Sequence, residues 1–559
     1  MRFPCSPRGA AARRDALSQA CKSVAVAGLW MLLPSVSAFG QEAAPVVSCE
    51  SLATLALPDT TITTAERVGA GEFKLPEPTR PPAGGEATGR PPAESRLPTG
   101  GPRADAADTR SLPAFCRVAA TLKPTSDSRI RMEVWLPLSA WNGKFMGVGG
   151  GGWAGSIMYA ARFAGATGLI DGLRRGYATA TTDSGHDASK PEEAGGRFTL
   201  GHPEKIIDYG YRAVHLMTAR GKQITTAFYG TPPRHAYFFG ASRGGYEAVT
   251  EAMRFPEDYD GIAAAWPPNP FVLFNAAQLW ANWLIAKNPS RLVPQTKYTM
   301  VHEAVLEACD ALDGAKDGQL DNPLDCHFDP AVRLCPGADG PGCLTAPQVE
   351  LLRKTYQGPV NPRTGEVIFP GPAPGNELGE MYSFATGQPR AVASEMFKYV
   401  VFQDPGWDWK TLNWDSDIDK ALEATAPMLT AYPRFKPLAD KGGKLMMFIG
   451  WVNYHNPKQL IEYYEEAVKD MGAERAADSL RLFTIPGRFE ETMFDKVKLV
   501  EDWVEERRAP EENLVSYYDA AGRLQRTRPL CAYPKLARYK GTGSTDDASN
   551  FICAESRFQ

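Results

Sequence analysis

A serine flanked by small residues is the first candidate for chemistry. The run Gly240-Ala241-Ser242-Arg243-Gly244 matches the G-x-S-x-G pattern and lies between a short apolar stretch and a stretch with helical spacing. A strand followed by a helix is the context that a nucleophile elbow requires. The small residues permit a tight turn that lifts the serine hydroxyl above a sheet. We therefore predict that Ser242 is a nucleophile.

Backbone N–H groups that could stabilise an oxyanion are predicted at two places. Arg243 follows the nucleophile and begins a helix whose N-terminal dipole favours negative charge near the serine. Upstream, the run Gly149 to Gly152 follows a predicted strand, where folds with such an elbow supply a second donor. Glycines also let the backbone approach a ligand closely. The predicted oxyanion-hole donors are Gly150, Gly151 and Arg243.

The sequence does not place a histidine where this serine would need its base. In folds with this elbow the chain order is serine, acid, histidine, and no histidine follows the last predicted strand of the sheet, 480–485. His455 lies in the C-terminal part of the chain and could reach the serine from a loop, but a surface or packing role is the favoured interpretation. The seven histidines are His186, His202, His215, His235, His302, His327 and His455.

The elements that must position these residues alternate between strands and helices. Apolar alternation and short apolar runs predict strands, and apolar residues three and four apart predict helices. The predicted strands are 130–136, 144–148, 177–182, 235–239, 261–266, 444–450 and 480–485, and the predicted helices are 209–228, 241–255, 457–471 and 494–506. Such alternation favours an α/β class with a mostly parallel sheet and helices on both faces.

A long interruption divides this pattern. Residues 267–440 hold four cysteines and many prolines, and we interpret them as a lid domain inserted into the α/β domain. The α/β domain then consists of 39–266 and 441–559, and its last part, from residue 514, is predicted to form a hairpin and a tail. Residues 76–110 are rich in proline and glycine with almost no large apolar side chain, which indicates a flexible insertion.

Composition and the first residues bear on partners and location. The 559-residue chain has a formal net charge of −4, which does not favour nucleic acid as a partner. Residues 1–38 combine basic residues with an apolar run that ends in Val36-Ser37-Ala38, the pattern of a signal peptide. No later stretch is long and apolar enough to span a membrane. We expect a secreted or periplasmic protein whose eight remaining cysteines form disulfides.

Several long stretches make a more specific resemblance. They include GVGGGGWAGSI, YFFGASRGGYEAVTEAMRFPEDYDGI and CDALDGAKDGQLDNPLDCHFDP, and together with others they run from about residue 49 to residue 553. These stretches resemble the tannase and feruloyl esterase family. The resemblance implies an α/β-hydrolase fold with a lid, a serine esterase activity, and a small aromatic ester or aromatic acid as the ligand.

The resemblance also implies a structural Ca²⁺ site in the lid and a set of disulfides. The calcium ligands would be the side chains of Asp310, Asp313 and Asp317 and the backbone carbonyls of Ala315 and Gln319. A tight, glycine-containing loop with several oxygens agrees with what Ca²⁺ prefers, although an acidic turn without metal is the alternative on spacing alone. The implied disulfides are Cys49–Cys116, Cys309–Cys326, Cys335–Cys343 and Cys531–Cys553.

The chain departs from the family pattern at its catalytic positions. In the family a cysteine precedes the serine and bridges to a cysteine beside the catalytic histidine, but Ala241 and Glu491 stand here. The stretch that supplies the acid reads GWVNY, with Asn453 at the carboxylate position. The stretch that supplies the histidine reads PGRFEE, with Glu490 at the histidine position. A serine hydroxyl is a weak nucleophile without a base, so the triad is predicted to be impaired.

Three functions therefore remain open at the level of sequence. The first is an ester hydrolase for feruloyl, galloyl or related aryl esters that uses Ser242 with a rebuilt base. The second is a lyase or isomerase in which Glu490 or His455 transfers a proton. The third is an inactive pseudo-hydrolase that binds an aromatic ligand under the lid. The ester hydrolase is the function that the resemblance favours.

Overall fold

A computed structural model of the chain describes residues 44–76, 108–161, 166–381, 386–487, 492–519 and 522–555. The predicted signal peptide and most of the predicted flexible insertion lie outside these residues. Residues 42–559 form one structural unit, so the sheet and the segment predicted as a lid belong together. Within the described ranges, no helix has the length and apolar character needed to cross a membrane.

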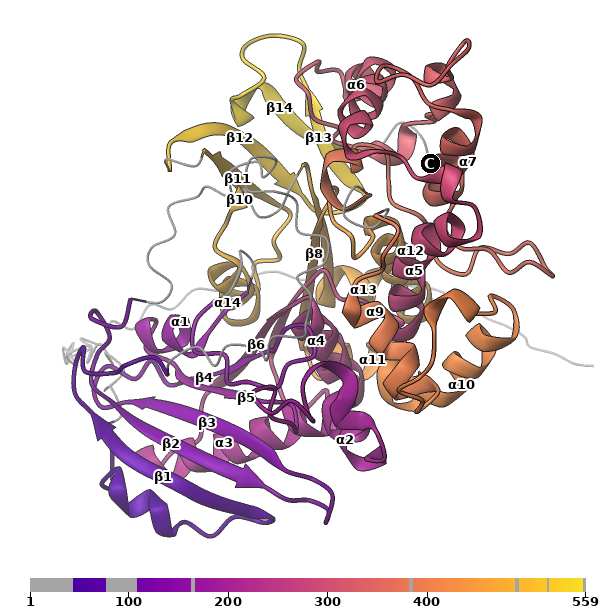
Figure 1. Ribbon diagram of the computed structural model, residues 1–559. Coiled ribbons are helices and arrows are strands. Elements are labelled where there is room, and N and C mark those ends of the chain that lie inside the picture. Colours follow the sequence, from indigo (N-terminus) through magenta and orange to yellow (C-terminus); the bar gives the residue numbers. More distant parts are fainter. Residues whose placement is uncertain are drawn as a thin grey trace, which may run out of the picture. The chain divides into compact units, whose positions relative to one another are not determined.

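A nine-stranded sheet carries the fold (Figure 1). Its strand order is β1-β2-β3-β5-β4-β6-β7-β8-β9. The first three strands, drawn in indigo and purple, pair antiparallel, as do β3 and β5, and the remaining pairs from β5 to β9 are parallel. The strands are β1 (Thr60–Val68), β2 (Phe115–Leu122), β3 (Ile130–Pro137), β4 (Lys144–Val148), β5 (Ala178–Thr182), β6 (His235–Ala241), β7 (Gly261–Ala265), β8 (Lys444–Gly450) and β9 (Leu480–Ile485).

Helices cover both faces of this sheet, as the α/β pattern predicts. The helices that pack against the strands are α1 (Leu169–Arg174), α3 (Ala213–Tyr229), α4 (Arg243–Arg254), α12 (Pro457–Met471), α13 (Ala473–Ser479) and α14 (Lys496–Glu506). Every residue of β5, β7, β8 and β9 is buried, because parallel strands in such a sheet are covered on both sides. The prediction of a mostly parallel α/β sheet is confirmed.

The segment between β7 and β8 contains helices and no strand among its described residues. It begins with α5, a long apolar helix most of whose residues are buried, and this helix contacts α7, α9 and α10. The helices of this segment are α5 (Phe271–Lys287), α6 (Tyr298–Cys309), α7 (Ala346–Gln357), α9 (Ala391–Glu395), α10 (Ser416–Leu429) and α11 (Lys436–Asp440), and a short α2 (Pro203–Ile207) precedes α3. The predicted lid therefore coincides with a helical insertion.

Two small sheets complete the chain. A three-stranded sheet contains β10 (Thr492–Met493), β11 (Glu512–Tyr518) and β12 (Leu524–Cys531). A two-stranded sheet pairs β13 (Lys535–Tyr539) with β14 (Phe551–Glu555). Both are drawn in gold and yellow in Figure 1. The predicted C-terminal hairpin corresponds to β11 and β12, and the predicted tail forms the second hairpin.

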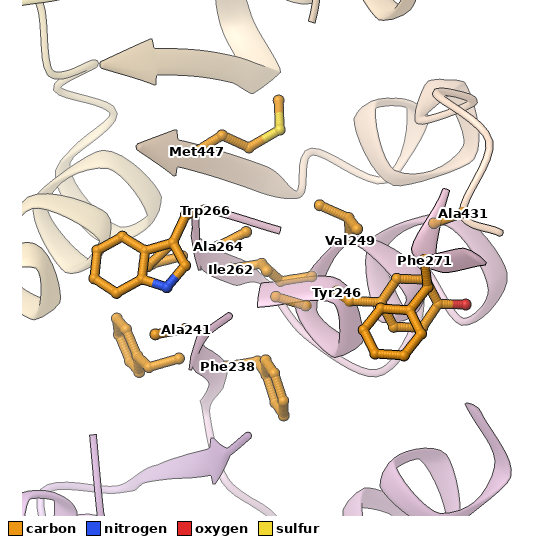
Figure 2. Close-up of a cluster of buried hydrophobic side chains, with 14 of the residues drawn as sticks. Phe238, Ala241, Tyr246, Val249, Ile262, Ala264, Trp266, Phe271, Ala431 and Met447 are labelled. Carbon is orange, nitrogen blue, oxygen red and sulfur yellow. The ribbon is translucent and has the colours of Figure 1, made fainter. Parts of the chain in front are cut away.

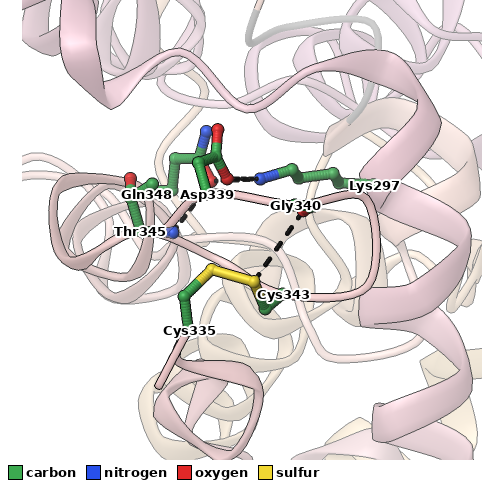
Figure 3. Close-up of a disulfide and its surroundings, with 7 residues drawn as sticks. All are labelled: Lys297, Cys335, Asp339, Gly340, Cys343, Thr345 and Gln348. Carbon is green, nitrogen blue, oxygen red and sulfur yellow. Dashed lines mark hydrogen bonds and ion pairs between the residues drawn. A yellow bond between two sulfur atoms is a disulfide. The ribbon is translucent and has the colours of Figure 1, made fainter. Parts of the chain in front are cut away.

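All four predicted disulfides are present. They join Cys49 to Cys116, Cys309 to Cys326, Cys335 to Cys343 and Cys531 to Cys553. Figure 3 shows the smallest of these loops, in the helical insertion, where Asp339 pairs with the buried Lys297 and the Thr345 N–H donates to Gln348. Disulfides persist in oxidising compartments, so this set agrees with export of the protein.

The central strands and α4 share a buried apolar cluster, shown in Figure 2. Tyr246 and Phe271 lie side by side in it, with ring centroids 5.8 Å apart. A close-packed interior holds its side chains in fixed positions, which is what a site at the strand ends needs. The labelled members are Phe238 and Ala241 of β6, Ile262 and Ala264 of β7, Trp266, Met447 of β8, Tyr246 and Val249 of α4, Phe271 and Ala431.

Candidate active site

Ser242 sits at the sharp turn between β6 and α4. Its φ of 57° and ψ of −120° lie in a region that non-glycine residues rarely occupy, and such strain is typical of a nucleophile elbow. The turn also requires its glycines: a Cβ on Gly240 would lie 2.1 Å from the carbonyl oxygen of Gly244. The serine is only partly buried. The local geometry is therefore that of the predicted elbow.

A histidine does reach this serine, and the interpretation of His455 as a surface or packing residue is wrong. The Nε2 atom of His455 lies 2.9 Å from the Oγ atom of Ser242, which is hydrogen-bonding distance. The histidine comes from the loop after β8 and is almost fully buried. The prediction that no base stands near the serine is wrong for the same reason.

Asn453 fixes the orientation of the His455 ring. Its Oδ1 atom accepts the backbone N–H of His455 at 2.9 Å and lies 2.8 Å from Nδ1 of the same residue. Because a backbone N–H can only donate, the side-chain atom of Asn453 that faces it is the oxygen. That oxygen in turn needs a proton on Nδ1. Nε2 is then unprotonated and accepts the hydroxyl hydrogen of Ser242.

The loop that carries both residues is held at its two ends. The Trp451 N–H donates to the carbonyl oxygen of Ile485 at 2.9 Å, which continues the pairing of β8 with β9. At the other end, the side-chain oxygen of Asn456 accepts the N–H of Gln459 and caps α12, and its amide nitrogen donates to the carbonyl oxygen of Pro370 at 2.6 Å. The imidazole is therefore fixed to both the sheet and the helical insertion.

Aromatic rings and a nearby cation set the protonation state of His455. The ring of Phe274 stacks on the imidazole with 5.0 Å between centroids, and Tyr454 lies 3.9 Å away. Burial, and in second place the positive charge of Arg390, lower the pKa of His455 well below its usual value of 6.5. Arg390 itself lies over the ring of Tyr454. The histidine is therefore neutral near neutral pH, as a general base must be.

The lowered pKa of His455 leads to a pH prediction. A base is active when it is unprotonated, and the protonated form of His455 is disfavoured by burial and by Arg390. We expect kcat/KM for an ester substrate to stay on its plateau as the pH falls through 6.5 and to decline only at lower pH. A pH–rate profile of the wild-type protein measures this. An acid limb centred at or above 6.5 would contradict the assigned environment of the base.

One of the predicted oxyanion-hole donors is already occupied. The N–H of Gly150 donates to a carboxylate oxygen of the buried Glu247 at 2.8 Å, so it is not free for a substrate oxyanion, and its prediction as a donor is wrong. Gly151, next in the chain, and Arg243, at the first position of α4, remain candidates. The first N–H groups of a helix have no partner within that helix, which suits Arg243 for this role. Glu490, which stands at the family's histidine position, lies outside the described residues.

The predicted calcium ligands lie together in one loop after α6. The Cys309–Cys326 disulfide closes this loop. Both carboxylate oxygens of Asp310 accept the N–H of Gly318 at 3.1 Å, and Asp313 accepts the N–H of Ala315 at 2.9 Å. Asp317 accepts the N–H of Gln319 at 3.2 Å. The backbone thus fixes three carboxylates in one short stretch.

A fourth carboxylate, which the sequence prediction missed, belongs to the same cluster. Asp321 is buried, and its N–H donates to Asp313 at 3.1 Å. Burial, followed by the charge of Asp313, raises the pKa of Asp321 to about 8. Burial and the charges of Asp317 and Asp310 raise the pKa of Asp313 to about 6, although backbone N–H groups oppose the shift. The carboxylates are therefore close enough to repel one another.

Two arginines from β12 offset part of this charge. Arg528 pairs with Asp317 and lies 3.8 Å from Asp321, and Arg526 lies 3.4 Å from Asp317. When all four carboxylates are ionised, they exceed these two guanidinium groups by two negative charges. A divalent cation would balance that excess, and carboxylate and carbonyl oxygens are the ligands that Ca²⁺ prefers. The donor types of this loop therefore match those that the cation implied by the resemblance prefers.

Known proteins resemble this chain over most of its length. The family model described as "Tannase and feruloyl esterase" matches residues 116–554. A Xanthomonas campestris protein, described as an uncharacterized esterase, is 35% identical over 95% of each chain. A probable feruloyl esterase B-2 of Aspergillus flavus is 31% identical over 67% of this chain and 70% of its own.

The solved structures agree with this result. Feruloyl esterase B from Aspergillus oryzae superposes with a TM-score of 0.76 and 25% sequence identity, and the match covers 90% of this chain and 99% of that one. The nine-stranded sheet, the elbow at Ser242 and the helical insertion are thus parts of an α/β-hydrolase fold. The chain belongs to the tannase and feruloyl esterase family, a family of esterases.

Proposed function

We propose that this protein hydrolyses aromatic carboxylic esters, of the feruloyl, galloyl or related aryl type, with Ser242 as nucleophile. The observation that carries the proposal is the 2.9 Å contact between Ser242 Oγ and His455 Nε2. Asn453 is the third member of the triad, because its oxygen fixes the tautomer of His455. The aromatic substrate class is supported by the feruloyl esterases among the relatives. Export, which would place the activity outside the cytoplasm, is supported by the four disulfides.

The reaction follows from these positions. Ser242 Oγ attacks the carbonyl carbon of the ester while its proton passes to Nε2 of His455, and the carbonyl oxygen becomes an oxyanion. The N–H groups of Arg243 and Gly151 are the proposed donors to that oxyanion. When the tetrahedral intermediate collapses, the C–O bond breaks and the alcohol leaves with the proton from Nε2. Water then attacks the acyl-enzyme with the same base and releases the acid.

The contact between Ser242 and His455 also supports one of the three functions over the other two. A lyase or isomerase and an inactive binding protein were considered because no histidine was expected at the serine. A histidine at hydrogen-bonding distance from the serine supports a serine hydrolase over both alternatives. The related Cys-His-Asn arrangement of papain-like proteases demonstrates that an asparagine can serve as the orienting member. Ester hydrolysis is thus the function that the site supports best.

Hydrolysis of methyl ferulate and methyl gallate by the purified protein tests the proposed function. We expect release of the free acid, measured by chromatography, with wild-type protein and none above background with Ser242→Ala. Aliphatic esters of matched leaving group serve as the comparison for the aromatic preference. Equal release by wild type and Ser242→Ala would contradict the role of the serine, and equal rates for aromatic and aliphatic acyl groups would contradict the substrate class.

We also propose that the loop 310–321 binds Ca²⁺ through the side chains of Asp310, Asp313 and Asp317 and the backbone carbonyls of Ala315 and Gln319. The cation would stabilise the folded protein by about 2.7 kcal/mol when present at 100 times its Kd, because it binds the folded loop and not the unfolded chain. We expect EGTA to lower the thermal unfolding temperature and added Ca²⁺ to restore it. In Asp313→Ala the unfolding temperature should not respond to either addition. An unchanged wild-type melting curve in EGTA would contradict the site.

A further inference from the structure

Glu247 is a buried carboxylate one turn into α4, directly behind the nucleophile elbow. Its side chain is about 1% exposed. One oxygen accepts the N–H of Gly150 at 2.8 Å, and the other accepts the hydroxyl of Ser184 at 3.2 Å. A guanidinium nitrogen of Arg243 lies 3.6 Å from the second oxygen. A buried charge is costly unless it is paired and hydrogen-bonded, and these contacts meet that need.

The partners of Glu247 come from the ends of three neighbouring strands. Gly150 follows β4, Ser184 follows β5, and Arg243 follows β6. These strands lie next to one another in the order β5-β4-β6. In open α/β sheets the ligand binds outside the carboxyl ends of the strands. Glu247 therefore ties together the loops that form one side of the active site.

The loop Gly149 to Gly152 consists of glycines, so no side chain of its own fixes its conformation. It lies directly on the elbow: a Cβ on Gly149 would be 2.8 Å from the Cα of Gly244, and a Cβ on Gly244 would be 2.8 Å from the carbonyl oxygen of Gly150. Glycine permits this approach but also permits many other backbone conformations. A fixed hydrogen bond from Glu247 to Gly150 restricts that freedom.

The guanidinium group of Arg243 offsets the negative charge of Glu247 beside the nucleophile elbow. The guanidinium of Arg243 lies 4.1 Å from the ring centroid of Tyr209 and 4.8 Å from that of Tyr246, and it donates to the carbonyl oxygen of Tyr209. The cation is thus held by aromatic faces beside the carboxylate. A carboxylate without such a cation would oppose an oxyanion that forms nearby.

We propose that Glu247 is a positioning residue for the oxyanion hole. By accepting the Gly150 N–H it fixes that peptide, so that the following N–H, of Gly151, is presented to the oxyanion together with the N–H of Arg243. The inference rests on the proposed ester hydrolysis. It assigns Glu247 no contact with substrate and no role as acid or base.

Two substitutions of Glu247 separate positioning from stability. Glu247→Gln keeps an oxygen that accepts the Gly150 N–H but leaves Arg243 without its counter-charge, so we expect a lower unfolding temperature and a kcat within about threefold of wild type. Glu247→Ala removes the acceptor, and we expect kcat to fall about 10- to 100-fold with little change in KM. The readouts are kcat and KM per active site, from burst titration of the acyl-enzyme, together with thermal unfolding.

Glu251 provides the matched control. It lies one turn further along α4 and is fully buried, and Glu251→Ala should lower the unfolding temperature without changing kcat per active site. Hydrogen exchange of a peptide containing residues 149–152 gives a readout that does not need activity. It should accelerate in Glu247→Ala and keep its wild-type rate in Glu247→Gln and Glu251→Ala.

The outcomes distinguish this inference from the proposed function. If wild-type protein hydrolyses no ester while the exchange pattern holds, the proposed function fails and the positioning of the loop stands. If Glu247→Ala leaves the exchange of residues 149–152 unchanged, or leaves kcat within twofold in an active enzyme, the inference is overturned. An equal loss of kcat in Glu247→Gln and Glu247→Ala would also overturn it.

Discussion

Replacing His455 by alanine is expected to lower kcat/KM for an aryl ester by about 10⁴-fold or more. The loss of one triad member has effects of this size, because a serine hydroxyl keeps its proton without a base. The Nε2 atom of His455, the proposed base, lies 2.9 Å from the Ser242 hydroxyl oxygen. Steady-state kinetics of the purified variant with methyl ferulate measure the effect, and thermal unfolding confirms that the variant is folded.

Two control variants test whether the loss of turnover is specific to His455. His202 is also a histidine with a side-chain partner, since it pairs with Asp127 at 2.6 Å on the surface, and His202→Ala should keep wild-type kinetics. Glu490→Gln should keep them too, because the proposed base is His455. A loss of turnover in Glu490→Gln with normal turnover in His455→Ala would show that the base was assigned to the wrong residue.

Asn453 is expected to control both the rate and its pH dependence. Asn453→Leu removes the oxygen that accepts two N–H groups of His455, and we expect kcat to fall about 100-fold or more, because the ring loses its tautomer and its orientation. Asn453→Asp keeps the acceptor and adds a negative charge that stabilises the imidazolium of the transition state. We expect it to raise kcat about 10-fold, which corresponds to about 1.4 kcal/mol of the barrier.

The gain expected from Asn453→Asp is limited because Asn453 already fixes the tautomer of His455 and lacks only the negative charge. When an asparagine replaces the aspartate of a serine protease triad, turnover falls about 10⁴-fold because the histidine adopts the wrong tautomer. Here the backbone N–H of His455 turns the oxygen of Asn453 toward the ring, so the tautomer is correct and only the charge is missing. Asn453→Asp should also raise the pKa of His455 and move the acid limb of kcat/KM to higher pH. A variant with unchanged rate and unchanged acid limb would contradict this role.

Much of the fold could be predicted from the sequence, since its signals are local. The strands 444–450 and 480–485 and the helix 457–471 have the predicted bounds, because apolar runs and helical spacing match the buried faces of those elements. The elbow at Ser242 was identified from five residues and their flanks. The disulfide pairs were implied by the resemblance rather than by spacing, and the structure confirms them.

The base could not be found by the order of triad residues along a chain. That order assumes a histidine after the last strand, whereas His455 comes from the loop that ordinarily carries the acid. A local signal was present: an asparagine side chain often accepts the backbone N–H two residues later, and this turn brings Asn453 and His455 together. The spacing of Asn453 and His455 is therefore the sequence feature that corresponds to this contact.

The sequence predictions for Gly150 and for the acidic cluster were wrong or incomplete because they depend on contacts that only the folded chain makes. Whether the N–H of Gly150 is free depends on Glu247, which lies 97 residues later and faces it only after β4 and β6 pair. Asp321 joins the acidic cluster because the loop folds back so that its N–H reaches Asp313. Patterns of residue types show which groups exist, but not which of them the folded chain has already engaged.

The most direct test of the catalytic assignment is the rate at which a fluorophosphonate labels Ser242 in wild-type protein and in His455→Ala at neutral pH. If His455 activates the serine, wild-type protein is labelled rapidly with one equivalent at Ser242, and the second-order rate constant falls by orders of magnitude in the variant. Equal rate constants for the two proteins, or a wild-type serine that is not labelled, would contradict that assignment.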